Sequence, residues 1–165
     1  IRDRINNSNL NIISGVDFFA FIFLIFLGVW TSTNYASLAC ADFPTCQGTY
    51  LPEMDFKSGF NLNQEVGPNY LYGLLDNPAR VAIHYSHRVS AILVTFIFLI
   101  LMSRLWFSEA APLASTLGIL LLTQIALGIT NVVYVLPLYV AIAHNLFAAC
   151  LLLATFTVNY LAWKK

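Results

Sequence analysis

Four long apolar segments dominate this chain and restrict the fold that it can adopt. Each has close to the roughly 20 apolar residues that a helix needs to cross a bilayer. In lipid, such a segment satisfies its own backbone hydrogen bonds as a helix. The composition agrees, because 59% of the residues are hydrophobic and only 10% are charged, far from the balance of soluble domains. We therefore predict an all-α integral membrane protein with spans at about 16–33, 80–105, 112–135 and 138–163.

The connections between these segments predict their arrangement. Residues 107–111 leave a short turn, and Leu136-Pro137 leaves almost no loop. Short connections make neighbouring helices antiparallel. The connection of about 35–79 is long and contains many Pro, Gly, Asn and acidic residues. We predict one domain over 1–165, an up-down-up-down four-helix bundle with a long outer loop after the first span, and we find no internal repeat.

The distribution of positive charge predicts the orientation. Basic residues favour the cytoplasmic side of a membrane, and here they gather on one side of the four-span arrangement: Arg2, Arg4, Arg104, Lys164 and Lys165, against Lys57 and Arg80 on the other. We expect both termini in the cytoplasm and the long loop outside. Asp17 lies near the cytoplasmic end of its span, where we expect it to reach water. The start at Ile1, with no Met and no visible signal peptide, is typical of a fragment or a trimmed chain.

Two histidines occur at matching depths in different spans. His87 follows Pro78 by nine residues and His144 follows Pro137 by seven, which places each on the order of 10 Å from the outer end of its helix. Their spans enter from the same side, so the imidazoles can face each other across the bundle. This arrangement suits a haem iron held between facing helices. The alternative is that each histidine hydrogen-bonds to a neighbouring helix.

Two charged or titratable neighbours accompany His87. His84 lies on roughly the same helix face, because it is three positions earlier, and it can serve the same site. Arg88 needs a partner inside the membrane. An anionic group such as a porphyrin propionate would supply one. Pairing with a loop carboxylate such as Asp76, or extension to the interface, is the alternative.

Small and polar residues of the other spans are open to two interpretations. Gln124 and Asn131 share one face of the third span, with Gly128 between them, and either a structural role or a cofactor contact is possible. Gly28 and Ser32 form a small-residue surface that we interpret as helix packing. Small residues around the histidines could leave room for a flat macrocycle, or could serve close packing: Ser86, Ser90, Ala91, Ala141, Ala143, Ala148 and Ala149.

The outer loop contains two cysteines, Cys40 and Cys46, which close a short loop around Pro44. In an oxidising compartment they can form a disulfide or a reversible redox pair; two unpaired thiols are the alternative. Zinc is disfavoured, because the loop has no histidine to complete a tetrahedral site. Cys150 lies in the middle of a span and is typical of a packing residue.

Several segments together resemble the carboxy-terminal half of a bacterial haem A synthase. They are the stretch from Trp30 to Cys40, the Asp-Phe-Pro turn at 42–48, and the segments 52–56, 83–88 and 143–145. Members of that family have eight spans in two similar halves. They oxidise a methyl group of haem O to the formyl group of haem A for cytochrome oxidase assembly. The resemblance implies a haem b cofactor in this half.

By this resemblance, His87 and His144 are the axial ligands, and Arg88 and His84 also belong to the cofactor site. His84 stands where the substrate half of the family commonly has a carboxylate, so we interpret it as a supporting residue, with ligation as the alternative, and we assign no catalytic residue. The implied partners are the bilayer, haem O, a preceding four-span half or second subunit, and cytochrome oxidase assembly factors, with no nucleic acid. The implied location is the bacterial cytoplasmic membrane, with the cysteine loop on the periplasmic side.

Three other functions compete with this interpretation. A stand-alone bis-histidine b-type cytochrome would use the same histidines to exchange electrons with quinone. A quinone-coupled thiol oxidoreductase would use Cys40 and Cys46, although such proteins typically need two outer cysteine pairs. A purely structural assembly subunit would leave His87 and His144 unexplained.

Overall fold

The computed structural model describes residues 8–63, 73–108 and 110–163. Four helices of this part are long and apolar enough to cross a membrane: α2 Ser8–Thr33, α4 Asn77–Phe107, α5 Ala111–Val133 and α6 Leu138–Trp163. The same ranges contain no β-strand, so the all-α membrane class is confirmed. Helix α2 begins eight residues before the first apolar segment, because the polar residues that precede the segment continue the helix.

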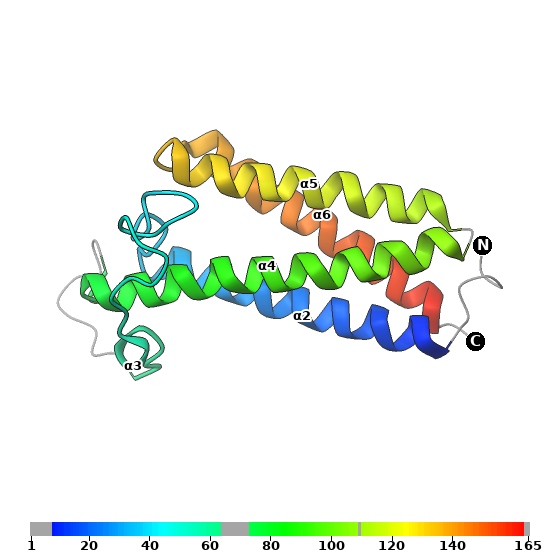
Figure 1. Cartoon of the computed structure of the whole chain (residues 1–165), viewed down its shortest axis with the longest axis horizontal. Helices are drawn as coiled ribbons and strands as arrows, with labels where there is room; N and C mark the ends of the chain where they lie inside the picture. The colour runs from blue at the N-terminus through cyan, green and yellow to red at the C-terminus, as the bar shows by residue number, and fades with distance from the viewer. Residues whose placement is uncertain (1–7, 64–72, 109, 164–165) are drawn as a thin grey trace.

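Successive long helices run in opposite directions (Figure 1). The start of α2 and the end of α6 lie together, and we call this the terminal end of the bundle. The opposite end, with α3 and the loop between α2 and α4, is called the loop end. Helix α2 packs against α4 and α6, and α5 packs against the same two helices. Helices α4 and α6 therefore lie diagonally across the bundle from each other.

Two helix caps and one hydrogen bond fix the structure of the loop end. The Asp76 side chain accepts a hydrogen bond from the Ala79 N–H and caps α4. Asp55 caps the short helix α3, Phe56–Gly59, in the same way. The Trp30 indole N–H of α2 then donates to the Gly59 carbonyl at 2.9 Å. Side-chain caps satisfy the first free N–H groups of a helix, so these aspartates fix where α3 and α4 begin.

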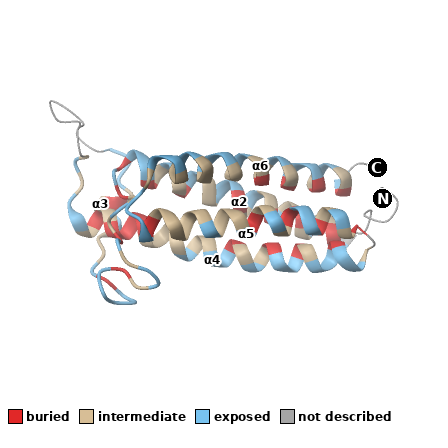
Figure 2. Ribbon diagram, turned by 90° about the horizontal axis from the view of Figure 1, so that it is seen from above, coloured by how far each residue is buried: buried red, intermediate tan, exposed pale blue. Residues whose placement is uncertain are grey.

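The larger of two buried apolar clusters lies in the half of the bundle near the terminal end, and the smaller, with Cys40, Cys46 and Val81, lies at the loop end (Figure 2). In α6 the first buried residue is Leu151, and in α5 none is buried between Leu121 and Val132. Along α4, none is buried between His84 and Val94. The stretch between the two clusters is therefore the part of the bundle with the fewest buried residues.

Asp17 does not reach water, contrary to the sequence-based expectation. Its side chain is 0% exposed, and neither carboxylate oxygen has a hydrogen-bond partner among the described residues. The reason is the early start of α2 at Ser8, which places Asp17 well inside a helix of 26 residues rather than at its end.

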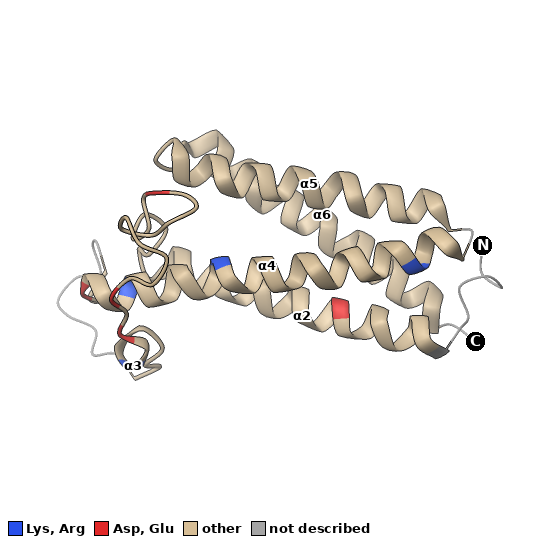
Figure 3. Ribbon diagram, viewed as in Figure 1, with Lys and Arg blue, Asp and Glu red and all other residues tan. Residues whose placement is uncertain are grey.

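The charges of the described residues lie mostly at the loop end (Figure 3). Four of the five basic residues behind the orientation prediction, Arg2, Arg4, Lys164 and Lys165, lie outside the described residues. The orientation therefore stays a prediction.

Candidate functional site

The two histidines singled out by their depth lie on the diagonal helices α4 and α6. His87 and His144 are both in the half of the bundle near the loop end, and each is only partly buried. The two imidazoles are close enough to interact electrostatically. The pair therefore occupies the region where the apolar core stops.

A glycine of the adjacent helix lies against each histidine. A Cβ placed on Gly28 of α2 would lie 3.2 Å from Cε1 of His87, and a Cβ on Gly128 of α5 would lie 3.2 Å from Cε1 of His144. Contacts this short are rare for real Cβ atoms. Each ring thus occupies space that glycine leaves free. Sequence reasoning had interpreted Gly28 as ordinary helix packing and did not connect either glycine with a histidine.

Both rings approach the glycine through Cε1. At His144 the edge formed by Cε1 and Nδ1 faces Gly128, whereas at His87 both ring nitrogens lie close to Gly28, Nδ1 at 3.7 Å and Nε2 at 3.9 Å from an added Cβ. The backbone of Leu24 lies near the His87 imidazole and that of Gln124 near the His144 imidazole, although neither buried Nδ1 has a hydrogen-bond partner within the described chain.

Within a helix, the backbone N–H is already bonded to the preceding turn, but the carbonyl oxygen keeps a second lone pair. For His144, whose Nδ1 edge faces α5, this favours the tautomer with the hydrogen on Nδ1, in which the lone pair is on Nε2.

Helices α2 and α5 thereby form a structural repeat that the sequence did not reveal. The interacting backbone residue lies four positions before the glycine in both helices, at 24 and 28 in one and at 124 and 128 in the other. The helices end at Thr33 and Val133, five positions after the glycine. Each of these positions in α5 lies 100 residues after its counterpart in α2. Alignment of the two segments is the sequence signal that could have pointed to both glycine contacts.

Helix α5 also brings polar side chains to this region. Nε2 of Gln124 lies 3.2 Å from Nε2 of His144. Oε1 of Gln124 and Oδ1 of Asn131 are buried without a hydrogen-bond partner in the described part of the chain. Buried polar atoms without partners are costly. The two histidines, their glycine contacts and the unsatisfied polar atoms therefore distinguish this region from the apolar core.

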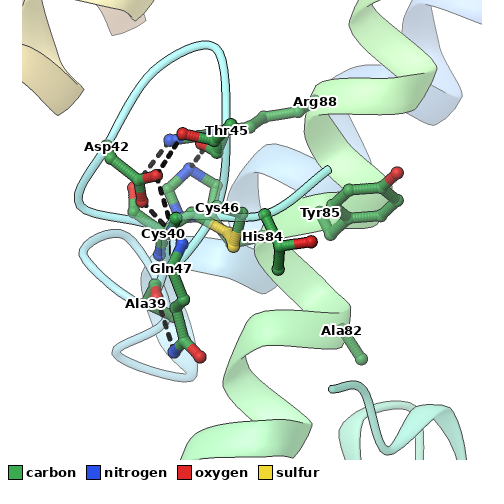
Figure 4. Close-up of a disulfide and its surroundings, with 12 residues drawn as sticks. Ala39, Cys40, Asp42, Thr45, Cys46, Gln47, Ala82, His84, Tyr85 and Arg88 are labelled. Atoms are coloured by element: carbon green, nitrogen blue, oxygen red, sulfur yellow. Dashed lines mark hydrogen bonds between the residues drawn. A yellow bond between two sulfur atoms is a disulfide. The ribbon is translucent and has the colours of Figure 1, made fainter. Parts of the chain in front are cut away.

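Arg88 is directed to the cysteine loop (Figure 4). Its guanidinium donates to the carbonyl of Thr45 at 2.9 Å and to that of Cys40 at 2.6 Å. The Asp42 carboxylate attracts the same group, and the Phe43 ring centroid lies 6.0 Å away. Asp76, the carboxylate considered as its partner, caps α4 instead. Arg88 therefore holds the loop on α4, and its pairing with a propionate stays a prediction.

His84 is buried, 5% exposed, under the same loop. The Cys40 N–H lies 3.3 Å from its Nδ1, and Nε of Arg88 lies 3.3 Å from its Nε2. A neutral imidazole accepts a hydrogen bond at only one nitrogen. Because Cys40 is fully buried and an unpaired buried N–H is costly, we assign the acceptor to Nδ1. A metal bond through that nitrogen would leave the Cys40 N–H unpaired, which favours the supporting role for His84.

The disulfide predicted for the outer loop is present. Cys40 and Cys46 are bonded, with their Cα atoms 4.6 Å apart, and both are buried. Two unpaired thiols, the alternative interpretation, are therefore wrong. Cys150 is a free, partly buried cysteine of α6.

Asp42 organises the chain around this disulfide. Its carboxylate accepts hydrogen bonds from the Thr45 hydroxyl and from the N–H groups of Gly48 and Gln47. These donors, with Thr45 first, lower the pKa of Asp42 from 3.8 to about 2. A carboxyl whose pKa is lower in the folded protein stabilises the fold above its ordinary pKa. That stabilisation is lost as the pH falls through the folded value.

We therefore expect acid to loosen the Asp42 loop in a pH-dependent way. In the native protein, the amides of Gln47 and Gly48 will be protected from hydrogen exchange near pH 4 and will lose protection toward about pH 2, where the Asp42 carboxyl takes up its proton. Asp42→Asn will make protection equally low at both pH values. Exchange measured by mass spectrometry tests this, with Asp55→Asn as the matched control, because Asp55 caps α3 only. Unchanged protection in Asp42→Asn would contradict the expectation.

The sequence is similar to those of several known proteins. Residues 2–156 match the COX15-CtaA family model, described as cytochrome oxidase assembly protein. The Heme A synthase of Shewanella oneidensis is 42% identical over 158 residues, which is 95% of this chain and 48% of the relative. That of Methylobacterium radiotolerans is 35% identical over 132 residues, 78% of this chain and 33% of the relative. That of Halalkalibacterium halodurans is 30% identical over 135 residues, 78% of this chain and 37% of the relative.

No solved structure matches the chain. The chain spans about half, or less, of the length of these relatives. The family model, in contrast, extends over nearly the whole chain, including both helices that carry the histidine pair. The chain therefore belongs to the COX15-CtaA family of cytochrome oxidase assembly proteins.

Proposed function

We propose that this chain is the haem b half of a haem A synthase. In this function it supports the oxidation of a haem O methyl group to the formyl group of haem A. The observation that carries the proposal is the histidine pair, His87 and His144, which lie on diagonal helices at the same end of the bundle, each against a glycine of the adjacent helix. The relatives that bear the name Heme A synthase support the reaction.

In this proposal His87 and His144 would be the axial ligands of the haem. A haem bound there would supply one-electron redox chemistry. Because the chain itself provides two imidazoles, no axial position is left for oxygen or substrate. The role of this half is then electron transfer, and the methyl group would be oxidised in the other half. His84 and Arg88 hold the disulfide loop over this end of the bundle.

We propose as partners a second four-span half, haem O and cytochrome oxidase assembly factors. The second half is supported by the length of the relatives, about twice that of the matched region or more. The proposed location is the bacterial cytoplasmic membrane, with both termini in the cytoplasm. The disulfide supports a loop on the periplasmic side, because disulfides persist in oxidising compartments.

The test uses the complete reading frame that contains this chain, expressed in a bacterium that makes haem O but lacks its own haem A synthase. Haems extracted from the membranes are separated by chromatography. We expect haem A with the complete protein and only haem O with the His144→Ala variant, while Cys150→Ser, a matched change in the same helix, keeps the activity. Haem O alone with the complete protein would overturn the proposal and favour the stand-alone cytochrome, which shares the histidine site but makes no haem A.

A further inference from the structure

The two histidine positions share a glycine contact and differ in the residue four positions before that glycine. At His87, the adjacent helix contributes Gly28 and, four positions earlier, Leu24. At His144, it contributes Gly128 and, four positions earlier, Gln124. Leucine has no donor to offer to an imidazole, whereas the Gln124 amide lies 3.2 Å from Nε2 of His144. The two positions therefore differ in whether a side chain of the adjacent helix offers a hydrogen bond to the nitrogen of the histidine that would bind the iron.

The direction of the contact between Gln124 and His144 follows from the tautomer. The Nδ1 edge of His144 faces the backbone of α5, where a carbonyl can accept the ring hydrogen. Nε2 then carries the lone pair, and the Gln124 NH₂ group is the donor. The reverse amide orientation would need a hydrogen on Nε2 and would leave two acceptors facing each other at Nδ1.

One lone pair cannot bind an iron ion and accept an amide hydrogen bond at the same time. We propose that Gln124 makes His144 the weaker and exchangeable axial position, whereas His87 is the permanent one. This rests on the proposed function, since it assumes a haem between the two histidines. In this arrangement His87 would be available to the haem first, and His144 would become available once the Gln124 side chain has left its Nε2.

The experiment exchanges the two matching residues in the complete protein. Gln124→Leu gives the His144 side the residue found on the His87 side, and Leu24→Gln does the reverse. Two quantities are measured in detergent: the rate of haem transfer to excess apomyoglobin, and carbon monoxide binding to the reduced protein, which requires that one axial histidine leaves. Gln124→Ala is a second variant without the amide. Thr123→Val is the control, because the Thr123 hydroxyl bonds to its own helix at the Ile119 carbonyl.

We expect Gln124→Leu and Gln124→Ala to lose haem about fivefold more slowly than the native protein, the factor that one hydrogen bond of ordinary net strength supplies. Both should bind less carbon monoxide, and Leu24→Gln should lose haem faster. Equal or faster haem loss in both Gln124 variants would overturn the proposal and leave the proposed function intact. A native protein without any low-spin haem would overturn both.

Discussion

Replacing either His87 or His144 with alanine will remove the low-spin b-type haem from the complete protein. The two imidazoles belong to diagonal helices, and each lies against a glycine of the adjacent helix. Loss of a residue that merely orients a metal ligand costs about 10- to 100-fold in metal affinity, so loss of a ligand itself should cost more than about 100-fold on that scale. The measurement is the reduced-minus-oxidised spectrum together with the haem-to-protein ratio of purified protein.

His84→Ala is the matched control for these variants, because it removes an imidazole from the same helix. We expect it to keep the haem and to loosen the disulfide loop, since the buried Cys40 N–H loses its acceptor. Protection of Cys40 and Cys46 from alkylation shows that each variant keeps the disulfide. Haem retained in both His87→Ala and His144→Ala would show that neither is a required ligand. Haem lost only in His84→Ala would transfer the ligand role to that residue.

The spans could be predicted from the sequence because the cost of placing polar backbone in lipid depends on segment length and composition alone. The ends of the spans could not. Hydropathy marks where the apolar stretch stops, whereas α2 continues through polar residues back to Ser8. This difference accounts for Asp17, which hydropathy places near water and the structure buries completely.

For the site, the depth of His87 and His144 was readable because helix rise converts position into distance. Their partners were not, since Gly28 and His87 are far apart in the sequence and meet only through the packing of α2 on α4. The partner of Arg88 could not be predicted for the same reason. The sequence requires that it has a partner inside the membrane, but carbonyls of a disulfide loop satisfy it as well as a propionate would.

Side chains added at Gly28 or Gly128 will weaken haem binding without unfolding the bundle. An alanine Cβ at either position would lie 3.2 Å from the histidine ring, and overpacking of this kind costs about 1–3 kcal/mol. Alanine also stabilises a helix by about 1 kcal/mol relative to glycine. The bundle should therefore stay folded while the histidine ring is displaced. With 1.4 kcal/mol per tenfold, we expect haem affinity to fall roughly tenfold for Gly28→Ala and Gly128→Ala. Leucine at either position should reduce it further.

Two other glycines of the same helices separate this steric effect from the general effect of alanine. At Gly118 of α5 the nearest atom to an added Cβ is Sδ of Met102 at 3.5 Å, and at Gly15 of α2 it is a ring carbon of Trp163 at 3.8 Å. Gly118→Ala and Gly15→Ala should therefore gain the same helix propensity and keep full haem affinity, measured by titration of the apoprotein with haem. If Gly28→Ala and Gly128→Ala bound haem as tightly as these controls, the rings would have moved freely. The glycines would then have no part in fixing the axial positions.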